Sequence, residues 1–167
     1  MIWRAFHLGF AMGTNDKPYP HEVERYFISC LLSDETIFRE CIGIMEYEYF
    51  GPPYHPQAVR SAKQHFAEHR TIPPVKLIEV ASGMEIMDLS REPIDPEWFR
   101  REIVEFCRYN ATQNVLLKGI DLMEEGKGDS LSDLMRQARS IGLDQPYKVS
   151  GALMPLFNCG RGRGWFA

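Results

Sequence analysis

The chain has 167 residues, of which 44% are hydrophobic and 12% aromatic, so it is long enough to fold around a substantial apolar core. Its 19 Lys and Arg residues are outnumbered by 23 Asp and Glu residues, and the net charge of −4 argues against a protein that attracts nucleic acid through its overall field. We therefore expect DNA binding to be weak or absent. None of the four cysteines has C-x-x-C spacing, which favours a reduced, cytoplasmic setting.

The first residues of the chain are interpreted as an N-terminal arm, residues 1–20. Arg4 and His7 interrupt the apolar side chains there, so no apolar run is long enough for a signal peptide. Nowhere does the sequence approach the roughly 18 consecutive apolar residues of a membrane span. We expect no membrane partner.

Residues 21–93 are predicted to form a small helical globule that begins with two short helices. Pro20 suits the first position of a helix that runs to about Ser33, and Ser33-Asp34 then supplies capping chemistry for the second helix. The apolar residues of both helices recur at the spacing of one buried face: Val23, Phe27, Cys30, Leu31, Ile37, Phe38, Cys41, Ile42 and Met45.

Two more helices are expected in the rest of the globule. The aromatic segment 47–54 contains Gly-Pro-Pro, which cannot continue a helix, so it should pack as a loop. A third helix restarts at Pro56 and ends before Pro73-Pro74, and a fourth covers 75–82. Residues 83–93 are predicted as a loop with at most one helical turn.

Residues 94–143 are predicted to form a long helical hairpin. Asp95-Pro96-Glu97 combines a capping side chain, a first-turn proline and an acid, which are three signals for the start of a helix. This helix should run to about Met123 and span about 40 Å, more than the globule can cover, so part of the hairpin should project. One face of the helix forms a seam with two polar members: Phe99, Ile103, Phe106, Asn110, Gln113, Leu117 and Ile120.

A return helix completes the predicted hairpin. Gly126 and Gly128 should end the long helix, Ser130 to Asp133 has the spacing of a capping box, and Gly142 is expected at the C′ position. No run of β-branched residues alternates with period two, so we predict an all-α fold. Residues 144–167 are interpreted as a linker-like tail.

The sequence offers little that indicates catalysis. His65, Glu68 and His69 match H-x-x-E-H, an inverted zinc-protease motif, but no third ligand stands in a comparable helical context. Gly126-Lys127-Gly128 lacks the spacing of a phosphate-binding loop, and the Arg-Gly segment 160–164 is a single short copy. We therefore predict no catalytic residues, no cofactor and no metal site.

The order of these signals resembles the N-terminal domain of DnaB-type replicative helicases over about Val23 to Tyr147. Residues 21–34 resemble the opening E-x-x-x-L-x-x-L-L-x-D of that domain, and residues 48–50 resemble its (D/E)-x-F segment. Residues 65–73 resemble its helix followed by a hydrophobic-Pro turn, and residues 110–120 its long hairpin helix. Leu134 to Ile141, LMRQARSI, is similar to a stretch before the motor linker of helicases from T-even-like phages.

The resemblance implies a domain that oligomerises as a collar and docks primase or a helicase loader during DNA replication in a phage-infected bacterial cell. Expected partners are other copies of the chain, as in a hexamer, a full-length DnaB-type helicase, and primase or loader. The sequence contains no nucleotide-binding motor, so ATP hydrolysis is not implied. A stand-alone regulator that mimics the collar to load or inhibit a complete helicase is the alternative.

The contacts with partners are expected on the hairpin. Aromatic, Leu and Met side chains dominate the energetics of protein interfaces when they are buried at the centre of the contact. The candidate interface residues are Trp98, Phe106, Tyr109, Leu117, Leu134 and Met135.

Overall fold

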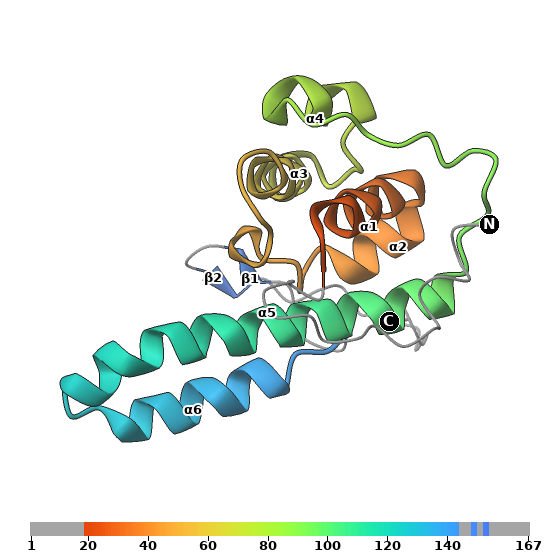
Figure 1. Ribbon diagram of the computed structural model, residues 1–167. Coiled ribbons are helices and arrows are strands. Elements are labelled where there is room, and N and C mark those ends of the chain that lie inside the picture. The colour runs from red at the N-terminus through yellow and green to blue at the C-terminus, as the bar shows by residue number, and fades with distance from the viewer. Residues whose placement is uncertain (1–18, 144–147, 150–151, 154–167) are drawn as a thin grey trace, which may run out of the picture.

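The computed structural model describes residues 19–143 and the segments 148–149 and 152–153 (Figure 1). Its helices are α1 (His21–Ser33), α2 (Glu35–Cys41), α3 (His55–His69), α4 (Val75–Ser82), α5 (Pro96–Glu124) and α6 (Gly128–Arg139), with a 3-10 turn, η2, at Tyr47–Tyr49. Two short strands, β1 (Lys148–Val149) and β2 (Ala152–Leu153), pair antiparallel. The all-α prediction is confirmed. Within the described part of the chain, none of the helices combines the length and the apolar character needed to cross a bilayer.

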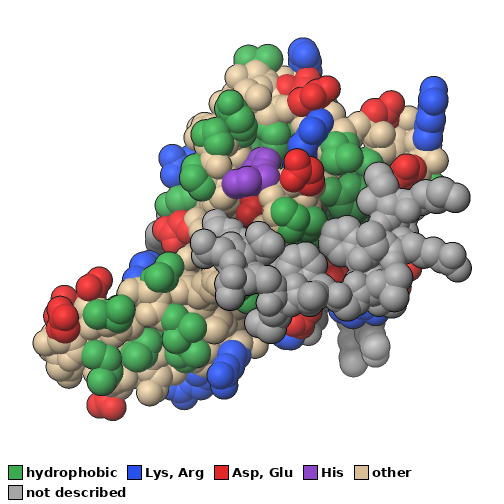
Figure 2. Space-filling model, in the orientation of Figure 1, with side chains coloured by type: hydrophobic (Ala, Val, Ile, Leu, Met, Phe, Trp, Pro, Cys, Tyr) green, Lys and Arg blue, Asp and Glu red, His purple; other side chains and the backbone are tan. Residues whose placement is uncertain are grey.

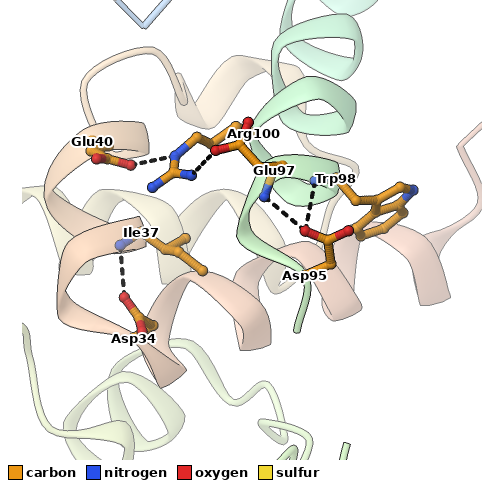
Figure 3. Close-up of polar contacts among 7 residues, drawn as sticks. All are labelled: Asp34, Ile37, Glu40, Asp95, Glu97, Trp98 and Arg100. Carbon is orange, nitrogen blue, oxygen red and sulfur yellow. Dashed lines mark hydrogen bonds and ion pairs between the residues drawn. The ribbon is translucent and has the colours of Figure 1, made fainter. Parts of the chain in front are cut away.

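Two aspartates start their helices as the sequence predicts (Figure 3). Asp34 caps α2 by accepting a hydrogen bond of 2.9 Å from the backbone N–H of Ile37. Asp95 caps α5 by accepting from the N–H groups of Glu97 and Trp98 at 3.0 and 3.4 Å. Each cap satisfies backbone donors that the helix itself leaves unpaired, which typically stabilises a protein by about 1 kcal/mol.

The core lies within the globule, where α1 packs on α2 and α3, and the first half of α5 packs against α2 and η2. Phe27 of α1 contacts Phe99 and Phe106 of α5 edge to face, with ring centroids 6.0 and 5.4 Å apart. On the rim of this contact, Arg100 of α5 donates a hydrogen bond of 2.6 Å to Glu40 of α2 (Figure 3). The globule therefore holds only the first half of α5. The largest fully buried side chains include Phe38, Phe99, Phe106, Ile28, Leu31, Ile42, Met45, Ile78 and Ile103.

The second half of α5 leaves the globule and pairs with α6 as an antiparallel hairpin (Figure 1). The turn is made by Gly126, whose φ of +73° is in the left-handed region that favours glycine. Gly119 permits the close approach of the two helices, because a Cβ there would lie 3.2 Å from Cδ1 of Leu131. Arg108 anchors the end of the return segment through a hydrogen bond of 2.8 Å to the carbonyl of Ile141.

Three predicted details of the helix ends are wrong. Pro20 occupies the N-cap position of α1 and not its first helical position. The capping box at Ser130 does not form, because α6 begins directly after the turn, at Gly128, with Lys127 as an N-cap that makes no side-chain hydrogen bond. Gly142 is not the C′ residue, since α6 ends at Arg139 with Ser140 as its C-cap. The tight turn at Gly126 starts the return helix earlier than the serine signal indicates.

Candidate functional site

The apolar seam of α5 is buried along the first half of the helix and exposed to solvent along the second half. Phe99, Ile103 and Phe106 are fully buried against the globule. Further along the same face, Leu117 is 74% exposed and Ile120 is 67% exposed. The spacing of these residues is that of one continuous helical face, so the change comes from the surroundings of the helix and not from its sequence.

The return helix does not cover the bare half of the seam, because it packs on another side of α5. Ala111 and Gly119 are the buried residues of α5 in this region, and Gly119 touches Leu131 of α6. At 100° per residue, Gly119 and Leu117 point in directions about 160° apart. The contact with α6 and the bare seam therefore lie on nearly opposite sides of α5.

The exposed end of α5 carries four large apolar side chains within eight residues, which we call the outer stripe: Leu116, Leu117, Ile120 and Met123. Their exposed fractions are between 57% and 74%. Figure 2 shows hydrophobic side chains gathered along the projecting hairpin. Clustered apolar residues of this size on a surface usually mark a site that contacts a partner.

The structure separates the six residues predicted as interface candidates. Leu117 belongs to the outer stripe, and Tyr109, 36% exposed, lies on the same side of α5 nearer to the globule. Phe106 is fully buried and is therefore a core residue, which removes it from any contact surface. The periodicity placed Phe106 correctly on the seam, but it could not show that the globule covers that point.

The remaining candidates lie away from the outer stripe. Trp98 packs partly against the core near Tyr26, with ring centroids 6.4 Å apart. It is about 28 Å from Leu117 along the helix axis, so the two cannot belong to one small patch. Leu134 and Met135 are half-buried on α6, where Leu134 lines an open groove between the hairpin and η2. Ile120 and Met123, absent from the predicted set, are 67% and 60% exposed, whereas Leu134 and Met135 are half-buried.

The H-x-x-E-H motif is an exposed polar face at the end of α3. The rings of His65 and His69 lie 4.6 Å apart, and Nε2 of His65 is 3.4 Å from the hydroxyl of Thr71. Nε2 of His69 is 3.8 Å from the carboxylate of Glu68. Among the described residues no further ligand completes a metal-binding group with these three.

A different polar cluster, which the sequence analysis did not predict, lies between α1 and α3. Glu24 accepts hydrogen bonds from the N–H of Gly51 at 2.8 Å and from Nδ1 of His55 at 2.7 Å. Nδ1 of His21 is 3.6 Å from the same carboxylate oxygen. Glu24 and His55 are 31 positions apart in the sequence, so no local motif could have indicated this cluster.

The buried cysteines do not provide a nucleophile. Burial raises the pKa of Cys30 and of Cys41 to about 12, and it also raises the pKa of Cys107. Because the thiolate is the reactive form, these thiols behave as small hydrophobic side chains near neutral pH. Cys159 lies outside the described residues.

Comparison with models of known protein families and with curated proteins finds no match for this chain. The resemblance to DnaB-type helicases therefore has no support beyond the ordered sequence patterns between Val23 and Tyr147.

Proposed function

We propose that this chain is a protein-docking and oligomerisation domain of the DnaB-type replicative helicase apparatus, acting in the cytoplasm of a phage-infected bacterial cell. The observation that carries the proposal is the outer stripe on the projecting half of the hairpin, with Leu117 at 74% exposure. A helical globule followed by a projecting hairpin is also the arrangement that the sequence resemblance implies.

The chemistry of the stripe suits a partner that presents an apolar surface. Burial of apolar area is the dominant favourable term in most protein association, so several Leu, Ile and Met side chains together can anchor a contact. The stripe carries no row of Lys or Arg residues that would match a phosphate backbone: LLKGIDLM, residues 116–123, contains one Lys and one Asp. Partners made of protein therefore fit this surface better than DNA.

Binding to immobilised chain distinguishes the partners. We expect DnaB-type phage helicases or their primases to bind at moderate salt, with an affinity that depends little on ionic strength. The double substitution Leu117→Asp/Ile120→Asp should lower the affinity by about tenfold or more, which corresponds to roughly 1.4 kcal/mol or more. Circular dichroism should show that its helices are intact.

Val80→Asp is the matched control, because Val80 is an apolar residue of the globule that is 77% exposed and lies on α4. It should leave binding unchanged. Binding of single-stranded DNA with a steep salt dependence, together with no binding of helicase or primase, would contradict the docking role. Binding of a complete helicase by a chain that never binds itself would favour the regulator over the collar domain.

A further inference from the structure

The ligand-type atoms of His21, Glu24 and His55 come together where α1 and α3 begin. One nitrogen from each imidazole and one oxygen of the carboxylate all lie within 4.8 Å of one another. His21 and Glu24 are one helical turn apart on α1, and His55 is the first residue of α3. Both backbone segments are helical, so the three side chains extend from well-defined positions.

The separations of these atoms suit a small ion. Zinc binds His nitrogen and Glu oxygen at about 2.0–2.2 Å, which places neighbouring ligand atoms of a tetrahedral site about 3.3 Å apart. The carboxylate oxygen of Glu24 is 2.7 Å from Nδ1 of His55 and 3.6 Å from Nδ1 of His21, values on either side of that spacing. The two imidazole nitrogens lie within 4.8 Å of each other, so all three ligand atoms must move closer to one centre to form a coordination site.

The burial of Glu24 supplies an independent reason for a cation. The side chain of Glu24 is 4% exposed, and no Lys or Arg among the described residues forms an ion pair with it. A buried carboxylate is costly unless a positive charge or a metal compensates it. The neighbours of Glu24 are one backbone N–H and two imidazoles, which are metal ligands when neutral.

The backbone at Gly51 closes one side of the cluster. A Cβ at this position would collide with the imidazole of His21 and lie 3.3 Å from the carboxylate oxygen of Glu24. The other side is open, because the side chain of His21 is 60% exposed. An ion could enter from the solvent past His21 and keep a water molecule on that side.

We propose that His21, Glu24 and His55 bind one divalent transition-metal ion of the zinc class. Two His and one Glu are a ligand set found in zinc sites that leave a fourth position open. Imidazole nitrogen disfavours Mg²⁺ and Ca²⁺, which prefer oxygen ligands. The ion would join the start of α1 to the start of α3 and so stabilise the globule, independently of the docking face on the hairpin. This inference departs from the sequence expectation that the chain has no metal site.

The test is titration of the chelator-treated chain with Zn²⁺, monitored by competition with a chromophoric chelator and by thermal unfolding. We expect one ion per chain and a higher Tm with zinc than without it, because a ligand that binds only the folded state stabilises it. Co²⁺ in place of Zn²⁺ should give the visible absorption of a tetrahedral site. Mg²⁺ and Ca²⁺ should have no effect on the Tm.

Two variants remove a ligand with little damage to the fold. His21→Ala changes an exposed side chain, and Glu24→Gln keeps an oxygen that can accept from the N–H of Gly51. Each should weaken zinc binding by at least about tenfold and reduce the zinc-dependent rise in Tm. The chelator-treated variants should still show a cooperative unfolding transition.

The matched control is His65→Ala/His69→Ala, which removes the exposed histidine pair of the H-x-x-E-H motif and should leave zinc binding unchanged. The proposal is overturned if the chain binds no stoichiometric zinc, in which case the cluster is only a hydrogen-bonded Glu–His pair. It is equally overturned if His21→Ala and Glu24→Gln bind zinc as tightly as the unmodified chain, or if the control loses zinc binding.

Discussion

The two halves of α5 carry apolar residues at the same helical spacing but lie in different surroundings. The inner half places Phe99, Ile103 and Phe106 in the core, where each is fully buried. The outer half places Leu117 and Ile120 in solvent, at 74% and 67% exposure. Helical periodicity therefore identifies an apolar face that is favourable to bury. The length of the neighbouring globule decides how much of that face is buried within one chain.

The largest difference between the halves should appear in thiol chemistry. Leu117→Cys places a thiol on the outer stripe, where an ordinary pKa of about 8.5 leaves about a quarter of it ionised at pH 8. Burial raises the pKa of Cys107 on the inner half of α5, as it does for Cys30 and Cys41 on α1 and α2, so almost none of these thiols is ionised at that pH. Ellman's reagent should therefore label one additional fast thiol in the variant, at a rate that rises with pH. If the variant gains no fast thiol relative to the unmodified chain, the outer stripe is covered.

Truncating a seam side chain to Ala should lower the free energy of unfolding much more in the inner half of α5 than in the outer half. Phe106→Ala leaves a cavity in the core and should lower the free energy of unfolding by about 3–5 kcal/mol. Leu117→Ala removes an exposed side chain and should change it by less than about 0.5 kcal/mol in a monomeric sample. Urea unfolding followed by circular dichroism measures both. Equal losses in the two variants would mean that the outer stripe is packed within the monomer.

The contact between α5 and α6 can be tested at Gly119. A Cβ there would lie 3.2 Å from Cδ1 of Leu131, and a branched side chain would force the two helices apart. Gly119→Val should therefore destabilise the hairpin by about 1–3 kcal/mol. Gly128→Val is a weaker perturbation, because the nearest atom to its Cβ is the flexible Met123 sulfur at 3.5 Å. Faster amide hydrogen exchange confined to α6 in Gly119→Val would place the damage in the hairpin; exchange that rises equally in α1 would argue against this description.

The smallest change in the free energy of unfolding is expected from the ion pair beside the inner half of α5. Arg100 is 2.6 Å from Glu40, but partly exposed ion pairs contribute only about 0.2–1 kcal/mol. Arg100→Gln should lower the free energy of unfolding by that amount, and less at high salt. Arg101→Gln is the control, since the side chain of Arg101 is 66% exposed and pairs only with its neighbour Glu102 among the described residues.

Much of the fold could be predicted because its signals are local. Asp34 and Asp95 are capping residues whose partners lie two or three positions along the chain, so a short window of sequence contains the whole interaction. The capping-box spacing at Ser130 is equally local, but the prediction from it is wrong. The turn at Gly126 lets α6 begin at Gly128, two residues before that serine. Two neighbouring start signals compete here, and the sequence alone does not show which of them the folded chain uses.

The candidate sites were harder to predict because they depend on contacts between distant residues. Periodicity identifies the seam, but the prediction of Phe106 as an interface residue is wrong, because Phe27 and Phe50 contact its ring in the core. The cluster around Glu24 joins residues from α1, from the loop at Gly51 and from α3, and only the packing of α1 on α3 brings them together. The net charge and the helical periodicity of the sequence contain no information on which distant residues the packing brings together.

The docking role of the outer stripe is tested most directly by sedimentation velocity of the purified chain over a range of concentrations. The sedimentation coefficient of the unmodified chain should rise with concentration, because copies associate through Leu116, Leu117, Ile120 and Met123. Leu117→Asp/Ile120→Asp should remain monomeric at every concentration, and Val80→Asp should associate like the unmodified chain. A strictly monomeric unmodified chain, or association that survives the double substitution, would contradict the claim that the outer half of α5 is an oligomerisation surface.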